Sequence, residues 1–140
     1  MLNAVLIDAG PLIALFDKDD KYHNEIKDFI AFKKYKFITT LAVIAETAHM
    51  LDFSVDVQID FLEWIANNGV ILCEIQNNDI SEIIKLTKKY SDIPMDFADA
   101  SLIIAAQKNS VKTIISLDKD FDIYRLPGKV KIKNVFDVKS

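Results

Sequence analysis

Short apolar runs alternate with helical segments along this 140-residue chain, and this alternation limits the folds that the chain can adopt. The runs at residues 4–8, 37–39, 70–75 and 113–116 are predicted to be strands, and a last strand is expected within residues 129–135. Strands that alternate with helices are typical of an α/β domain with parallel strands. The sequence therefore predicts an α/β fold with a central, mostly parallel sheet, and its length indicates a single domain, residues 1–140.

The segments between these runs carry signals for the ends of helices. Asp19 and Asp20 can cap a helix, Thr39 or Thr40 can cap the next one, and Asn67-Asn68-Gly69 is a common stop. We expect helices over residues 12–16, from 20 to about 32, 41–51, from 54 or 56 to 67, 80–90, and from Pro94 to about 109.

Composition excludes several classes of protein. The chain has three glycines and three prolines, whereas average usage would give about 17 of the two together. This scarcity excludes collagen-like and low-complexity chains and disfavours an all-β fold, whose turns consume both residues. With 17 basic and 21 acidic residues the net charge is −4, so there is no electrostatic footprint for passive binding of DNA or RNA.

Other features concern the compartment. A single cysteine, Cys73, excludes an internal disulfide framework, and we expect its thiol to be buried and inert. Asp8 ends the first apolar run too early for a signal peptide, and no segment reaches the roughly 18 uncharged apolar residues of a membrane span. We therefore expect a cytoplasmic protein without membrane association.

The positions of the acids are more informative than their number. Asp8 ends the first predicted strand, and Asp118 lies two residues after the run at 113–116. Ligands of α/β sheets bind outside the carboxyl ends of the strands. Asp96 and Asp99 share one face of a predicted helix near its amino end, where the helix dipole alone also favours acids.

Glu46 lies in the segment 41–51, which is apolar nearly all round and is predicted to be a largely buried helix. A carboxylate in such a helix is costly unless it is paired or binds a metal. The alternative is that Glu46 lies on a narrow solvated stripe with His49 and Met50. Taken alone, the segment leaves both interpretations open.

Together, Asp8, Glu46, Asp99 and Asp118 would place four carboxylates around one crevice. Like charges raise each other's pKa, so such a cluster stays ionised at neutral pH only with a cation. Mg²⁺ or Mn²⁺ is the usual partner of an all-oxygen site. Zinc is disfavoured, because the chain has one cysteine and two histidines without ligand spacing.

Four stretches of the chain resemble the PIN-domain family of metal-dependent ribonucleases, in particular the small VapC-type toxins of prokaryotic toxin–antitoxin pairs. They are VLIDAGPLIAL at residues 5–15, TTLAVIAE at 39–46, DFADA at 96–100 and SLDKDF at 116–121. No single stretch is specific, but all four occur in the order that the family has.

The resemblance implies a three-layer α/β/α domain that hydrolyses RNA phosphodiester bonds with Mg²⁺ or Mn²⁺ and leaves a 5′-phosphate. It implies that Asp8, Glu46, Asp99 and Asp118 are the catalytic acids. The metal ligands would be Asp8, Asp99 and Asp118, with Asp96 as an additional acid that could assist a second metal. Ser116 would orient Asp118 or the attacking water, and no organic cofactor is expected.

The resemblance also implies a homodimer and a small antitoxin protein as partners, besides the RNA substrate. The apolar helix face of Phe53, Val57, Phe61 and Trp64 could supply a surface for either protein. Candidate contacts to RNA phosphates are Lys33, Lys34, Lys36, Lys112 and Lys119.

Two other protein classes fit these motifs less well. A phosphoacceptor receiver domain is also small, acidic and Mg²⁺-binding, but it needs an adjacent acid pair where Asp8 is followed by Ala9 and Gly10. A phosphatase of the haloacid-dehalogenase type needs a second aspartate at position 10. Within the PIN family, an RNA-processing nuclease without an antitoxin remains an open alternative.

Overall fold

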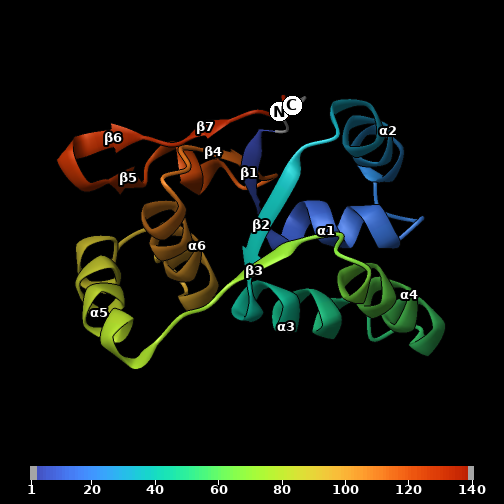
Figure 1. Ribbon diagram of the computed structural model, residues 1–140, viewed down its shortest axis with the longest axis horizontal. Helices are drawn as coiled ribbons and strands as arrows, with labels where there is room; N and C mark the ends of the chain where they lie inside the picture. The colour runs from blue at the N-terminus through green and yellow to red at the C-terminus, as the bar shows by residue number, and fades with distance from the viewer. Residues whose placement is uncertain (1–2, 139–140) are drawn as a thin grey trace.

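The computed structural model describes residues 3–138 and contains a parallel sheet with helices on both sides (Figure 1). The sheet has five strands in the order β3-β2-β1-β4-β7, and every pairing in it is parallel. The strands are β1 (Ala4–Ile7), β2 (Lys36–Thr40), β3 (Ile71–Cys73), β4 (Thr113–Ile115) and β7 (Lys133–Asn134). The predicted three-layer α/β/α architecture with a mostly parallel sheet is confirmed.

Helices cover both sides of the sheet, and one further helix lies along its carboxyl edge. The helices α1 (Ala9–Phe16), α2 (His23–Lys33) and α4 (Val55–Ala66) lie on one side of the sheet, and α5 (Ile80–Lys89) and α6 (Phe97–Asn109) on the other (Figure 1). Helix α3 (Leu41–Met50) follows β2 without a loop, at the carboxyl edge of the sheet. Among the described residues, no helix combines the length and the apolar character that a bilayer crossing requires.

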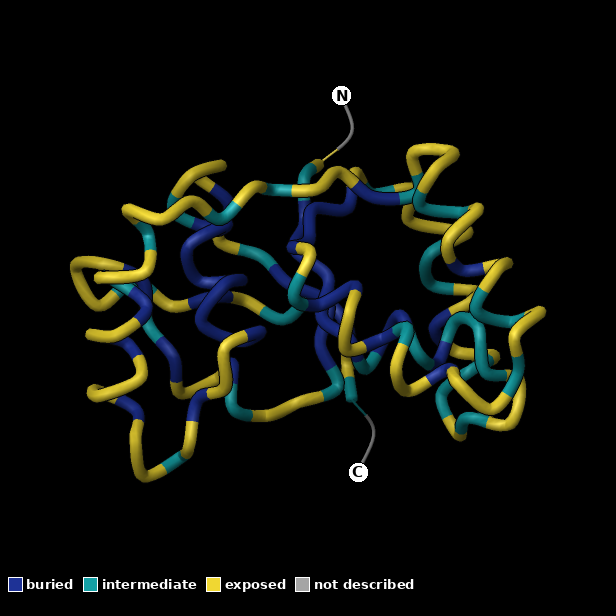
Figure 2. The backbone as a smooth tube through the Cα atoms, turned by 90° about the horizontal axis from the view of Figure 1, so that it is seen from below, coloured by how far each residue is buried: buried dark blue, intermediate teal, exposed yellow. Residues whose placement is uncertain are grey.

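Much of the backbone in the middle of the molecule is buried (Figure 2), and β1, β4 and α6 supply many of the core residues. Residues 98–106 of α6 are all buried, because the helix carries small and aliphatic side chains on every side. The hydroxyls of Thr40 and Ser101 lie 2.7 Å apart and join the end of β2 to this helix. The amino-terminal half of α6 is thereby held at the carboxyl end of β2.

The structure differs from the sequence-based expectation at α6 and after β4. Helix α6 begins at Phe97 and not at Pro94, because the Asp96 carboxylate accepts a hydrogen bond from the Asp99 amide at 2.8 Å and caps the helix there. The expected strand at 129–135 is divided. Its first part, β6 (Val130–Lys131), pairs antiparallel with β5 (Arg125–Leu126) in a separate hairpin, and β7 then joins the main sheet.

The prediction that Cys73 is buried is wrong. Cys73 is half-buried, because β3 is the edge strand of the sheet and its neighbours Ile71 and Leu72 are exposed. The apolar residues suggested as a protein-binding surface differ in exposure: Phe53 precedes α4 and is 59% exposed, whereas Val57 and Trp64 are half-buried. Phe61 is fully buried, and the ring centroids of Phe61 and Trp64 lie 5.4 and 5.6 Å from that of Phe16.

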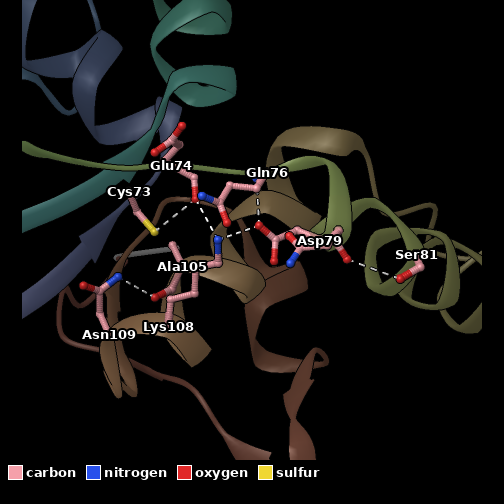
Figure 3. A network of polar contacts seen from close by, with 9 residues as sticks. Cys73, Glu74, Gln76, Asp79, Ser81, Ala105, Lys108 and Asn109 are labelled. Carbon is pink, nitrogen blue, oxygen red and sulfur yellow. Dashed lines mark hydrogen bonds and ion pairs between the residues drawn. The ribbon is translucent and has the colours of Figure 1, made fainter.

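A polar network fastens the carboxyl end of α6 to the segment between β3 and α5 (Figure 3). The Lys108 ammonium donates to the Glu74 carbonyl at 2.9 Å and lies 2.5 Å from the Asp79 carboxylate. The same carboxylate accepts a hydrogen bond from the Gln76 amide, and the Lys108 bond lowers the pKa of Asp79 below its usual value. These contacts hold the start of α5 against α6.

Candidate metal centre

Three carboxylates from distant parts of the chain meet at the carboxyl edge of the sheet. Asp8, Asp99 and Asp118 each offer an oxygen atom, and these atoms lie within 4.8 Å of one another. Asp8 follows β1, Asp118 follows β4, and the two strands are parallel neighbours whose ends are joined by a bond from the Asp8 amide to the Ile115 carbonyl. Asp99 comes from the first turn of α6. Asp8 and Asp99 are buried and Asp118 is exposed, so the group opens to solvent on the Asp118 side.

Both oxygens of Asp8 are oriented by hydrogen bonds. Its Oδ1 accepts from the Ala9 amide at 2.8 Å, which caps α1, and its Oδ2 accepts from the Ser116 hydroxyl at 3.1 Å. Burial raises the pKa of Asp8 to about 6, against the lowering effect of these two bonds, and the charges of Asp118 and Glu46 add to the rise. A cation at this position would therefore favour the ionised carboxylate.

Asp99 is held by a tyrosine that the sequence did not single out. The hydroxyl of Tyr124, a fully buried residue, donates to the Asp99 Oδ2 at 3.1 Å. The Tyr124 ring packs edge-on between Tyr90 and Phe121, with centroids 5.0 and 5.1 Å away, so it has little freedom to turn. The pKa of Asp99 is raised to about 7, chiefly by burial and then by the charges of Asp96 and Asp8, against the lowering effect of the Tyr124 bond.

Ser116 connects two of the three acids. Its hydroxyl donates to Asp8 and accepts from the Asp118 amide at 2.9 Å. Asn134 on β7 donates to the Ser116 carbonyl at 2.8 Å and accepts from the Ser116 amide at 3.3 Å. Asn134 is a second residue that the sequence did not indicate. Hydrogen bonds therefore fix both the hydroxyl and the backbone of Ser116.

Glu46 and Asp96 lie outside the group of three. Helix α3 is not largely buried as expected, because it runs along the rim of the fold and packs on α1 and α6 on one side only. Partial burial and the charges of Asp96 and Asp118 nevertheless raise the pKa of Glu46, so its carboxylate shares their electrostatic environment. The solvated-stripe interpretation is correct for the exposed residues Leu41, Ala45, Glu46, His49 and Met50.

The chemistry of the donor set fits a hard cation. All three ligand atoms are carboxylate oxygens, and no histidine or cysteine among the described residues joins them. Asp8 and Asp99 are buried, and burial destabilises their charged forms and raises their pKa values. A cation beside them would offset this cost. An apolar hollow of about 610 Å³ is lined in part by Leu41 and Phe97, the first residues of the helices α3 and α6 that carry Glu46 and Asp99.

The family model of the PIN domain matches residues 5–126 of the chain. The chain belongs to the PIN-domain family. Within that family it is similar to Ribonuclease VapC26 of Mycobacterium tuberculosis (strain ATCC 25618 / H37Rv), with 24% identity over 117 residues that cover 82% of this PIN domain and 87% of the relative.

Two solved structures share the fold of this PIN domain. The crystal structure of VapC20 from Mycobacterium tuberculosis, described as a Sarcin-Ricin loop cleaving toxin, matches with a TM-score of 0.77 and 17% identity, over 91% of this chain and 98% of that one. VapBC2 from Rickettsia felis, bound to a DNA fragment from the promoter of the pair, matches with a TM-score of 0.64 and 11% identity, over 94% of this chain and 98% of that one. At these identities the likeness concerns the fold.

Proposed function

We propose that this PIN domain is a metal-dependent endoribonuclease that hydrolyses RNA phosphodiester bonds and acts as the toxin of a VapBC-type toxin–antitoxin pair. The observation that carries the proposal is the convergence of Asp8, Asp99 and Asp118 within 4.8 Å at the carboxyl edge of the sheet. The similarity to Ribonuclease VapC26 supports the same reaction class.

Asp8, Asp99 and Asp118 would hold Mg²⁺ or Mn²⁺, and Asp96 would assist a second ion. A bound ion polarises the scissile phosphate and lowers the pKa of a coordinated water. Because all the donors are oxygens, the site favours these two ions over zinc.

The other side chains of the centre have separate roles. Ser116 and Tyr124 orient the carboxylates of Asp8 and Asp99 through their hydrogen bonds. Glu46, exposed at the rim and with a raised pKa, is available to accept a proton from the attacking water. The reaction needs no nucleophilic side chain, because water displaces the leaving oxygen directly.

The test is cleavage of single-stranded RNA in Mn²⁺, with and without EDTA, by the wild type and by the Asp8→Asn and Asp99→Asn variants. We expect cleavage only with metal and a loss in both variants. Asp28→Asn, an exposed acid on α2, is the matched control and should cleave normally. Cleavage that persists in EDTA, or that both centre variants retain in full, would contradict the proposal.

The biological setting is also part of the proposal: a cytoplasmic location, a homodimer and a small antitoxin protein. The fold shared with one chain of the VapBC2 structure from Rickettsia felis is consistent with an antitoxin partner. Induction in cells should arrest growth, and co-expression of a small reading frame adjacent to the gene should relieve the arrest. Light scattering on the purified chain measures its oligomeric state. Cleavage without growth arrest would favour the alternative, an RNA-processing nuclease without an antitoxin.

A further inference from the structure

A groove with basic walls lies between α5, the end of α6 and the β5–β6 hairpin. Its volume is about 400 Å³, and its charged lining consists of Lys85, Lys89, Arg125 and Lys129 against one acid, Glu82. The buried side chains of Leu86 and Leu126 complete the lining together with Gln107, Pro127 and Gly128. Four cations against one acid are distinctive in a chain whose net charge is −4.

The positive charges of the groove are poorly compensated within the molecule. Glu82 lies 4.0 Å from Lys85, whose side chain is 77% exposed, and such surface pairs contribute little. Within residues 3–138, no carboxylate lies at ion-pair distance from Lys89, Arg125 or Lys129. The Arg125 guanidinium donates to the carbonyl oxygens of Asp122 and Tyr124, at 2.6 and 2.9 Å. These neutral acceptors fix the guanidinium without neutralising its charge.

A chain of contacts through two tyrosines links the wall of the groove to the metal centre. Lys89 directly precedes Tyr90, and Arg125 directly follows Tyr124. The Arg125 amide donates to the Tyr90 hydroxyl at 2.9 Å, the rings of Tyr90 and Tyr124 are in contact, and Tyr124 holds Asp99. The backbone of Arg125 and the Asp99 carboxylate are therefore linked through one buried aromatic cluster.

We infer that this groove binds the phosphate backbone of the RNA strand beside the cleavage position, an inference that rests on the proposed function. The carboxylates repel a polyanion wherever no cation covers them, so affinity for RNA must come from lysine and arginine elsewhere. Within the described part of the chain no aromatic side chain lines the groove, which favours contacts to phosphates over stacking on bases.

The lysines suggested by sequence at the start of β2 are less suitable. Lys36 begins β2 and pairs with Ala4 at the amino end of β1, whereas Asp8 follows the carboxyl end of β1. Lys33 ends the neighbouring helix α2, on the other side of the sheet from α5 (Figure 1). These lysines lie at the opposite edge of the sheet from the metal centre.

The test compares two charge reversals in the full chain. Lys85→Glu/Lys89→Glu changes the groove, and Lys27→Glu/Lys33→Glu makes the same change in charge on α2. Binding of a fluorescent single-stranded RNA is measured by anisotropy in EDTA over a range of KCl concentrations. We expect the groove variant to bind at least about tenfold more weakly, with a salt slope smaller by about 0.7 for each phosphate that is no longer neutralised. The α2 variant should bind like the wild type.

Lys129→Gly separates a loss of charge from a loss of folding. Lys129 has φ 62°, a left-handed conformation that glycine adopts more easily. This variant should unfold no more readily than the wild type, yet bind RNA more weakly. In Mn²⁺, the groove variants should raise KM and leave kcat unchanged.

The outcomes distinguish this inference from the proposed function. A wild type that binds RNA through the groove but does not cleave it would leave the inference standing and refute the nuclease. A wild type that cleaves RNA, with groove variants that bind as tightly as it does, would overturn the inference alone. Equal losses of RNA affinity in the groove variant and the α2 variant would also overturn it. So would a groove variant that binds RNA normally but no longer binds an acidic protein partner.

Discussion

Two helices present acids to the same crevice, but they hold them in different ways. Asp99 lies in the buried part of α6, and its carboxylate is fixed by Tyr124. Glu46 is exposed on α3 and makes no hydrogen bond or ion pair with any of residues 3–138. A fixed, buried carboxylate is suited to holding a cation, and a solvated one to exchanging a proton with water. Under the proposed function, this difference would make Asp99 an acid that holds the cation and Glu46 an acid that accepts a proton.

The largest effect is expected from replacing, in separate variants, one acid on each helix. Asp99→Asn should lower both RNA cleavage and Mn²⁺ affinity at least about a hundredfold, because losing even a residue that orients a metal ligand costs about 10- to 100-fold. Glu46→Gln should lower cleavage but change Mn²⁺ affinity less than about threefold, because it lies outside the group of three. Calorimetric titration with Mn²⁺ and single-turnover cleavage measure the two quantities. Equal losses of Mn²⁺ affinity would remove the distinction between the helices.

Tyr124→Phe tests whether the fixed geometry of Asp99 matters. We expect Mn²⁺ affinity to fall about tenfold, as for other residues that orient metal ligands. The pKa of Asp99 should rise, because the Tyr124 bond lowers it, and the acid limb of the cleavage profile should move to higher pH.

Tyr90→Phe is the control for this variant. It removes a hydroxyl from the same aromatic cluster, but that hydroxyl accepts from the Arg125 amide and is bonded to none of the carboxylates of the centre. Thermal unfolding of both variants measures any loss of stability. Indistinguishable Mn²⁺ affinities in the two would show that the Tyr124 bond does not position Asp99.

The metal-free protein should lose stability as the pH rises. Burial raises the pKa of Asp8 to about 6 and that of Asp99 to about 7, whereas an unfolded aspartate has a pKa of about 4. Between about pH 4 and pH 7 the folded state therefore binds more protons than the unfolded one, and the free energy of unfolding falls as the pH rises. Mg²⁺ should reverse this trend, because it binds only the ionised, folded site.

Urea unfolding at pH 5 and pH 8, in EDTA and in Mg²⁺, measures this effect. The double variant Asp8→Asn/Asp99→Asn should show a flatter dependence on pH and no response to Mg²⁺. A metal-free wild type that gains stability across the window would mean that these two acids are not the buried, charge-destabilised groups described above.

The smallest effect concerns Asp96, which caps α6 and is also proposed to assist a second ion. Asp96→Ala should cost about 1 kcal/mol of unfolding free energy through loss of the cap of α6, whereas Asp96→Asn keeps the cap. If Asp96 assists a second ion, Asp96→Asn should raise the Mn²⁺ concentration for half-maximal cleavage about two- to threefold, as expected for one nearby charge. Unchanged Mn²⁺ dependence would leave Asp96 as a cap alone.

The sequence by itself determined the fold class and most of the acid group. The alternation of apolar runs and helical segments specified parallel strands, and the carboxyl ends of neighbouring parallel strands share one edge. For this reason the sequence alone was enough to predict that Asp8 and Asp118 meet. The position of Asp99 near the amino end of a helix followed from spacing that is equally local.

Only the tertiary structure decided which surfaces of the helices were covered. Periodicity shows that α3 is apolar nearly all round, but packing against α1 and α6 left Glu46 on the open side. The bonds from Tyr124 to Asp99 and from Asn134 to Ser116 join residues 25 and 18 positions apart, and the basic groove needs three separate elements. Local pattern fixes the face on which a side chain lies, whereas packing between distant segments determines what that face meets.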